Sequence, residues 1–96
     1  MNKYEIMFIV KATIESDVVT KTADTFKSLF NDEESKVLEF KNMGERKFAY
    51  PIKKEINGYY FLMQVETTAD LVKEFERKAL IEENILRHLI IKLDEE

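Results

Sequence analysis

The spacing of hydrophobic residues switches repeatedly between two periods along this chain, and the order of the switches limits the fold more than any other feature. Between Tyr4 and Val10 every second residue is apolar, which predicts a strand with one apolar face. The spacing then lengthens to three and four residues, as in an amphipathic helix, before alternation returns. A 96-residue chain with such a pattern has room for one modest core.

Two segments have helical spacing. The first follows Glu15, Ser16 and Asp17, which supply acids and a possible N-cap, and we expect it to end near Asn31 and Asp32. Its apolar stripe is Val19, Thr22, Ala23, Phe26, Leu29 and Phe30. The second begins with helix-start chemistry at Thr67, Thr68 and Asp70 and ends before Asn84. Its stripe is Leu71, Val72, Phe75 and Ala79.

Three further segments are predicted to be extended. Residues Val37–Tyr50 form an arm that leads, past Pro51 and the Asn57-Gly58 pair, through a hairpin loop into a returning strand at Tyr59–Glu66. Ile85–Leu93 is the last strand. The resulting order β-α-β-β-α-β predicts an α+β, ferredoxin-like fold: a four-stranded antiparallel sheet with both helices on one face. We expect residues 1–96 to form a single domain with a short acidic tail at 94–96.

In that fold one sheet face is left without helices. Strand alternation places on it a set that is too apolar for a merely solvated surface: Met7, Ile9, Tyr60, Leu62, Leu89 and Ile91. We interpret these residues as a partner-binding surface. Two alternatives stay open at this stage: a bulge that reverses the alternation, or burial of both faces in a homodimer.

Composition excludes several classes of function. The chain has no cysteine, one histidine and two glycines, so it offers no catalytic triad, no phosphate-binding glycine loop and no convergent set of metal ligands. His88 lies within an apolar strand, where a structural role is favoured. We expect no enzyme activity, cofactor or small-molecule substrate. The absence of cysteine favours the cytoplasm. The amino-terminal apolar run is too short for a secretion signal or membrane span, so we expect a soluble protein.

Charge is distributed unevenly. The net charge is −4, yet residues 41–54 carry five bases against one acid, while residues 15–34 carry six acids against two bases. Basic side chains interleaved with an aromatic suit irregular RNA, although a solvated charged hairpin has the same composition. The candidate RNA-binding residues are Arg46, Lys47, Tyr50, Lys53 and Lys54, with Lys3 and Arg87 as possible extensions of the patch.

Several short motifs occur together in a recognisable order. They are Tyr4-Glu5, then Gly44-x-Arg46-Lys47-Phe48-Ala49-Tyr50-Pro51-Ile52, then Gly58-Tyr59-Tyr60, and finally Ile85-Leu86-Arg87-His88. Together they resemble the bacterial small-subunit ribosomal protein six family, from about Tyr4 to Lys92.

The resemblance implies a structural protein of the small ribosomal subunit, cytoplasmic and without catalytic activity. It implies binding to small-subunit ribosomal RNA as a heterodimer with a basic partner, the eighteenth protein of that subunit, which docks near the sheet edge and open face. By motif, Arg46, Lys47, Tyr50 and Lys54 match the family's basic hairpin, and Arg87 matches the arginine of its last strand. Leu80 departs from the family, which often has an arginine near that position.

Other functions of the same fold are weaker alternatives. A regulatory or small-molecule-binding domain that dimerises through its open face would form homodimers without RNA affinity. An RRM-type RNA reader needs an aromatic-rich signature strand that this sequence lacks, and an acylphosphatase-like hydrolase needs a phosphate loop.

Overall fold

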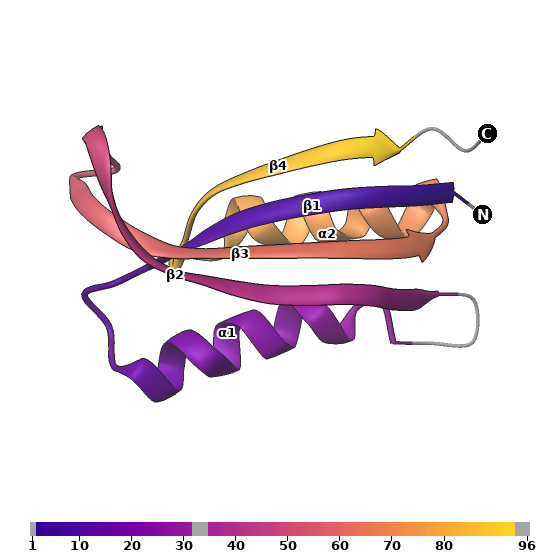
Figure 1. Cartoon of the computed structure of the whole chain (residues 1–96), viewed down its shortest axis with the longest axis horizontal. Coiled ribbons are helices and arrows are strands. Elements are labelled where there is room, and N and C mark those ends of the chain that lie inside the picture. The colour runs from indigo at the N-terminus through magenta and orange to yellow at the C-terminus, as the bar shows by residue number, and fades with distance from the viewer. Residues whose placement is uncertain (1, 32–34, 94–96) are drawn as a thin grey trace.

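The structure, a computed structural model, describes residues 2–31 and 35–93. Its elements follow one another as β1 (Asn2–Lys11), α1 (Ser16–Ser28), β2 (Lys36–Ile52), β3 (Glu55–Thr67), α2 (Ala69–Ile81) and β4 (Ile85–Leu93) (Figure 1). This order confirms the predicted β-α-β-β-α-β fold. The acidic residues 32–34 and the tail at 94–96 lie outside the described residues.

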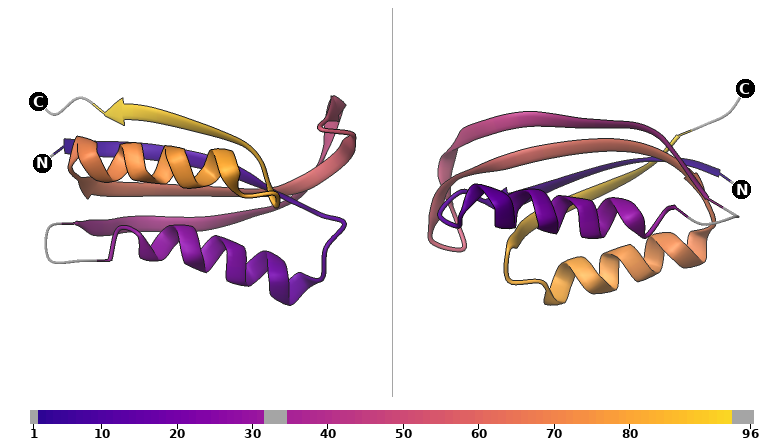
Figure 2. Two further views of the ribbon diagram at one scale, coloured as in Figure 1. Left: turned by 180° about the vertical axis from the view of Figure 1, so that it is seen from behind. Right: turned by 90° about the horizontal axis from the view of Figure 1, so that it is seen from below.

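The four strands form one antiparallel sheet in the order β2-β3-β1-β4. Both helices cover the same face of this sheet and leave the other face open (Figure 2). The central strand β1 pairs with β3 on one side and with β4 on the other, so Met7 lies opposite both Leu62 and Leu89. Because residues that face each other across strands point to the same side of a sheet, this register fixes which side chains share the open face.

The main core lies between the sheet and the helices. Ile6, Phe8 and Val10 of β1 are fully buried, as the alternation in the sequence predicted. Phe75 of α2 is also fully buried, and its ring centroid lies 6.0 Å from that of Phe8. Phe26 of α1 meets Phe75 edge-on at 5.4 Å. Aromatic contacts thus join both helices to the centre of the sheet.

The two helices begin differently. At the start of α2, the Thr68 hydroxyl accepts a hydrogen bond from the backbone N–H of Leu71 at 3.4 Å, which makes Thr68 the N-cap among the three helix-start residues expected from the sequence. At the start of α1, the N-cap residue is Glu15, and its side chain makes no capping hydrogen bond. Helix α1 ends at Ser28, earlier than expected from the apolar stripe, although Phe30 beyond it is fully buried.

The β2–β3 hairpin turns within the loop predicted between Pro51 and Gly58, but the turn is shorter than expected. Its turn is Lys53-Lys54, between the paired residues Ile52 and Glu55, whereas the Asn57-Gly58 pair lies within β3. Both lysines have positive φ angles, 49° and 69°, as the central residues of a type I′ turn require. Asparagine and glycine usually fill such a turn, so two lysines gave no signal for it.

Strand β2 is irregular near this turn. Lys47 pairs with Asn57 and Ile52 with Glu55, so the four residues Phe48–Pro51 of β2 lie opposite a single residue of β3. Proline has no N–H to donate, and an edge strand with such a bulge can contain it without losing a ladder bond. The bulged end of the hairpin curls away from the plane of the sheet (Figure 1).

Candidate functional site

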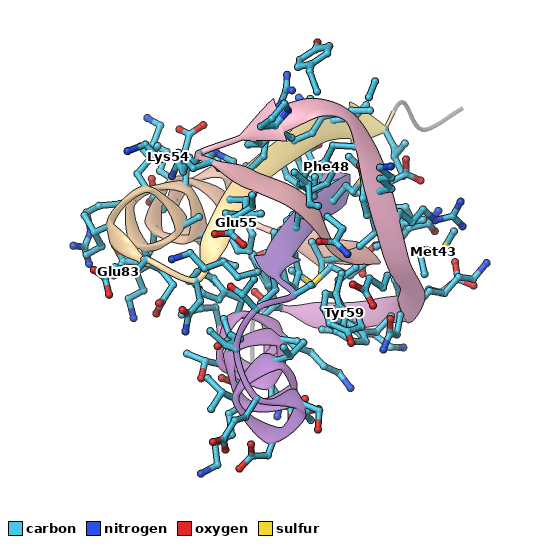
Figure 3. The ribbon with its side chains drawn as sticks, turned by 90° about the vertical axis from the view of Figure 1, so that its left-hand side faces the viewer. Met43, Phe48, Lys54, Glu55, Tyr59 and Glu83 are labelled. Atoms are coloured by element: carbon cyan, nitrogen blue, oxygen red, sulfur yellow. The ribbon has the colours of Figure 1, made fainter. Side chains whose placement is uncertain are left out.

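A second apolar cluster holds the curled hairpin against the open face of the sheet. Phe48 of β2 packs with Ile9 of β1 and Leu86 of β4, and Ile52 and Tyr60 pack around them. Figure 3 shows Phe48 beneath the arch of the hairpin. The exposed fractions of Phe48, Ile9 and Leu86 are only 9%, 2% and 3%. The hairpin end is therefore a packed part of the molecule, in which the backbone of residues 46–54 is held by a small core of its own.

Gly58 makes this packing possible. A Cβ at this position would lie 2.7 Å from Cγ2 of Ile9, 3.0 Å from Cζ of Phe48 and 3.0 Å from the carbonyl oxygen of Val10. These distances leave no space for a side chain. Because Gly58 has no side chain, the Phe48 ring can pack directly against β3 at this point.

The basic residues gather around two neighbouring hollows at this end. The first, of about 190 Å³, is bordered by Lys47, Tyr50 and Arg87, with Phe48 and Tyr60 among its other lining residues. The second, of about 210 Å³, includes Lys53 and Arg87 together with Leu80 and His88. Arg87 of β4 borders both hollows, so the structure brings it to the hairpin residues, as the sequence analysis proposed.

The other candidate RNA-binding residues fall in two places. Arg46 and Lys54 are exposed on the hairpin, and a guanidinium N–H of Arg46 donates to the Met43 carbonyl at 3.5 Å. Lys3 lies near the start of β1, opposite Leu93, six residues from the Ile9–Arg87 pair. At the rise of a β-strand this separation is about 20 Å. Lys3 is therefore not an extension of the same patch, which corrects the expectation from sequence.

Leu80 borders the second hollow beside Lys53, and 69% of it is exposed. The position where the resemblance led us to expect an arginine thus lies at the rim of the basic surface. The leucine adds an exposed apolar side chain to this rim, beside the cations Lys53 and Arg87.

The open face contains the predicted apolar residues, but they are not equally accessible. Met7 and Leu62 are half-buried in the middle of the sheet, while Leu89 and Ile91 on the edge strand β4 are 51% and 45% exposed. Ile9 packs against Phe48 and is only 2% exposed, and Tyr60 is half-buried beside it. The accessible part of the face is a strip that begins where the hairpin cluster ends.

His88 lies on the helix-covered side of the sheet. Its ring meets Phe75 edge-on, with centroids 6.2 Å apart, and its Nε2 lies 3.7 Å from a carboxylate oxygen of Glu76. These contacts are those of a packed side chain. Within residues 2–31 and 35–93, no group of three His, Cys, Asp or Glu side chains is placed to hold a metal ion.

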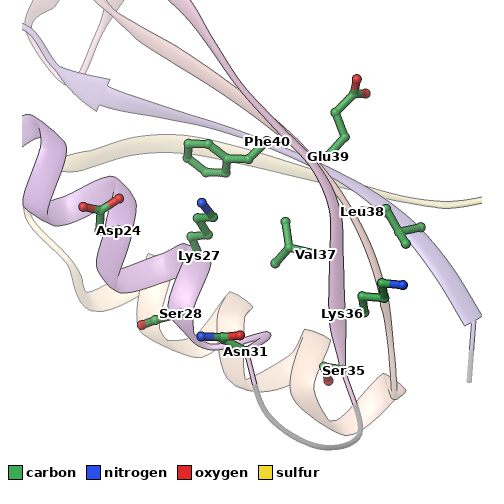
Figure 4. A pocket seen from close by; sticks show the side chains of 10 residues that line it. All are labelled: Asp24, Lys27, Ser28, Asn31, Ser35, Lys36, Val37, Leu38, Glu39 and Phe40. Carbon is green, nitrogen blue, oxygen red and sulfur yellow. The ribbon is translucent and has the colours of Figure 1, made fainter.

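A groove of about 710 Å³ lies on another flank of the molecule, between α1 and the edge strand β2 (Figure 4). Lys27 crosses it, with its ammonium 4.9 Å from the centroid of the Phe40 ring. Its other charged lining residues are Asp24, Lys36 and Glu39, so the groove has no dominant sign of charge. No pattern in the sequence indicates this groove, because it depends on how α1 lies against the sheet edge.

Comparison with known proteins decides the family. A family model described as ribosomal protein S6 matches residues 3–92, nearly the whole chain. The chain belongs to the ribosomal protein S6 family. It is also similar to a solved structure, the 30S ribosomal protein S6 of Thermotoga maritima, at 26% sequence identity and a TM-score of 0.88. That match covers 96% of this chain and 87% of the other.

Membership assigns a role at the level of the family. Ribosomal protein S6 is a structural protein of the small ribosomal subunit, and its family is not an enzyme family. This confirms the resemblance seen in the sequence motifs. None of the helices within the described ranges has the length and apolar character needed to cross a membrane.

Proposed function

We propose that this S6-family chain binds small-subunit ribosomal RNA through the hairpin end and a basic protein partner through the open face. The observation that carries the proposal is that Arg87 of the last strand borders the same hollows as Lys47 and Lys53 of the hairpin. Cations from separate strands thereby form one surface, with exposed Tyr50 among them.

The RNA surface is suited to phosphates. Arg46, Lys47, Lys53 and Lys54 are all exposed on a hairpin that the Phe48 cluster fixes in place. Because the backbone is already fixed, binding a ligand here does not require the hairpin itself to be ordered, and that entropic cost is avoided. Two acids nearby are engaged locally: Glu45 accepts from the Asn57 amide at 2.5 Å, and Glu55 accepts from the Thr13 hydroxyl at 3.1 Å.

The partner surface is the accessible apolar strip of Met7, Leu62, Leu89 and Ile91, with Tyr60 at its border. An exposed apolar strip bordered by polar residues is typical of a protein–protein contact. The partner we propose is the eighteenth protein of the small subunit, a small basic protein. Its positive charge would offset the net charge of −4 that makes this chain a weak RNA binder alone.

Mobility-shift titration of small-subunit ribosomal RNA tests the proposal, with this chain alone, the basic partner alone and the two together. We expect tight binding only for the pair, with an affinity that falls as salt rises. Tight, salt-insensitive binding by the isolated chain would contradict the proposal.

The contribution of the hairpin is tested by replacing Arg46 and Lys47 with glutamine in the pair. We expect weaker binding and a salt slope reduced by about one unit for each lost phosphate contact. Replacement of Lys21 and Lys73, exposed lysines on the two helices, removes the same charge from outside the proposed surface and serves as the control. Equal losses in both double variants would show that net charge alone matters.

A further inference from the structure

We infer that the hollow beside Tyr50 receives one unstacked nucleobase of the RNA, so that the hairpin end binds an irregular or single-stranded nucleotide rather than a continuous duplex. The inference rests on the proposed RNA-binding function and specifies the form of RNA that this site takes. It follows from three properties of the hollow: its aromatic lining, its cations and its size.

The three aromatic side chains that line the hollow differ in how exposed they are. Phe48 is buried and forms part of the floor, Tyr60 is half-buried, and Tyr50 is 72% exposed. The Phe48 and Tyr60 ring centroids lie 6.1 Å apart with an interplanar angle of 56°, so these two rings already pack against each other. The Tyr50 ring is therefore the aromatic surface available to a ligand, next to a proline that restricts its backbone. An exposed aromatic beside cations is the arrangement on which single-stranded bases stack.

The cations surround this aromatic surface. Lys47 of β2 and Arg87 of β4 border the hollow from different strands. Arg87 also borders the neighbouring hollow, which Lys53 lines. Phosphates on both sides of a stacked base would therefore meet positive charge. A protein side chain from a basic partner would instead bring its own positive charge against Lys47 and Arg87, so charge complementarity favours a nucleotide.

The size of the hollow suits a single nucleobase. Its volume of about 190 Å³ corresponds to roughly six water molecules at about 30 Å³ each. This is room for one planar ring system. In an A-form duplex the bases are stacked and paired inside the helix, whereas loops, bulges and ends present bases that can be splayed out. A loop or bulge nucleotide is the form of RNA that fits.

The test uses the full chain at low salt, with a fluorescein-labelled decauridylate as the single-stranded probe and a blunt ten-base-pair RNA duplex as the alternative. We expect tighter binding to decauridylate than to the duplex. Tyr50→Leu removes the aromatic face and should weaken decauridylate binding about 5- to 150-fold. Tyr50→Phe keeps the face and should bind like the unmodified chain. The salt slope should be the same in all three, because stacking releases no counterions.

Tyr50 suits this test because its high exposure makes misfolding of the variants a minor concern, and Ile56→Leu, an exposed site on β3, is the matched control. Equal affinity of Tyr50→Leu and the unmodified chain for decauridylate, or equal affinity for the duplex, would overturn the inference and leave RNA binding standing. Failure to bind either RNA, even with the basic partner present, would overturn both. If Tyr50→Leu weakens association with the basic partner in the absence of RNA, the hollow is a protein site and the inference is wrong.

Discussion

The ring of Phe48 lies so close to Gly58 that a single added carbon on the glycine would come within 3.0 Å of it. We expect Gly58→Ala to destabilise the fold by about 1–3 kcal/mol, because the new Cβ also meets Ile9 and the carbonyl of Val10, a backbone atom that has little freedom to move. Urea unfolding measures the loss. The same change should shift the NMR signals of the Phe48 ring and the Ile9 methyl groups.

Gly44 provides the control for that substitution. Its φ angle is 88°, and nothing lies within 4 Å of the position of an added Cβ. Gly44→Ala should therefore cost about 1–2 kcal/mol through backbone strain alone and leave the Phe48 signals in place. Unchanged stability of Gly58→Ala would contradict the tight packing described for the hairpin.

At the turn Lys53-Lys54, residues that would stabilise the fold differ from those that would bind RNA. Replacing Lys53 with asparagine and Lys54 with glycine supplies the residues that a type I′ turn favours, and should stabilise the chain by about 1 kcal/mol. The same change removes two cations from the proposed RNA surface, so RNA affinity should fall and the salt slope should decrease. Urea unfolding and mobility shift, performed on one preparation, check both effects. A stabilised variant with full RNA affinity would show that neither lysine contacts phosphate.

The unequal helix starts give opposite expectations for two substitutions. Thr68→Ala removes the hydroxyl that accepts from Leu71 and should cost about 1 kcal/mol. Glu15→Ser introduces a short hydroxyl at the start of α1, where no side chain now caps the helix, and should raise stability by up to about 1 kcal/mol. Thermal unfolding of both variants should show changes of opposite sign. Changes of the same sign would contradict the assignment of the caps.

On the exposed surface of α2, the hydrogen bonds and charge of Arg77 lower the pKa of the Glu74 carboxyl. The Arg77 guanidinium donates to both carboxylate oxygens of Glu74, at 2.8 and 3.0 Å. Because the pKa is lower in the folded chain, the pair stabilises the fold above the ordinary glutamate pKa, and this contribution disappears as the pH falls through the folded-state value. The pair is exposed, so the effect on unfolding should be small.

Carbon NMR of the Glu74 carboxyl measures this pKa directly. We expect a titration midpoint below the usual glutamate range in the unmodified chain, and a return to that range in Arg77→Gln. A midpoint that Arg77→Gln leaves unchanged would show that the pair does not form in solution.

The sequence predicted what periodicity and local chemistry determine. Alternation placed Ile6 and Phe8 in the core and Leu89 and Ile91 on the open face, and the hydroxyls of Thr67 and Thr68 indicated where α2 starts. It did not predict the docking of Phe48 on Ile9, because that contact joins residues 39 positions apart through a bulged strand. No local pattern encodes such a contact.

The candidate site divides in the same way. The basic hairpin and Arg87 were recognisable from residue type and motif, and their shared hollow depends on the curl of the hairpin. Strand alternation correctly places Ile9 on the open face, and for that reason it was expected at the partner surface. Only the packing of Phe48 shows that it is covered. Lys3 was grouped with the hairpin cations by charge alone, and the sheet register separates them.

The central claim is that two adjoining surfaces have separate tasks, and calorimetric titration of the basic partner into three forms of this chain tests it most directly. The forms are the unmodified chain, the Leu89→Asn, Ile91→Asn double variant of the open face, and the Arg46→Gln, Lys47→Gln double variant of the hairpin. The asparagine variant keeps the net charge and removes apolar area, so we predict that it loses partner affinity at least tenfold. The hairpin variant should bind the partner as the unmodified chain does. Full partner affinity of the asparagine variant would contradict the account.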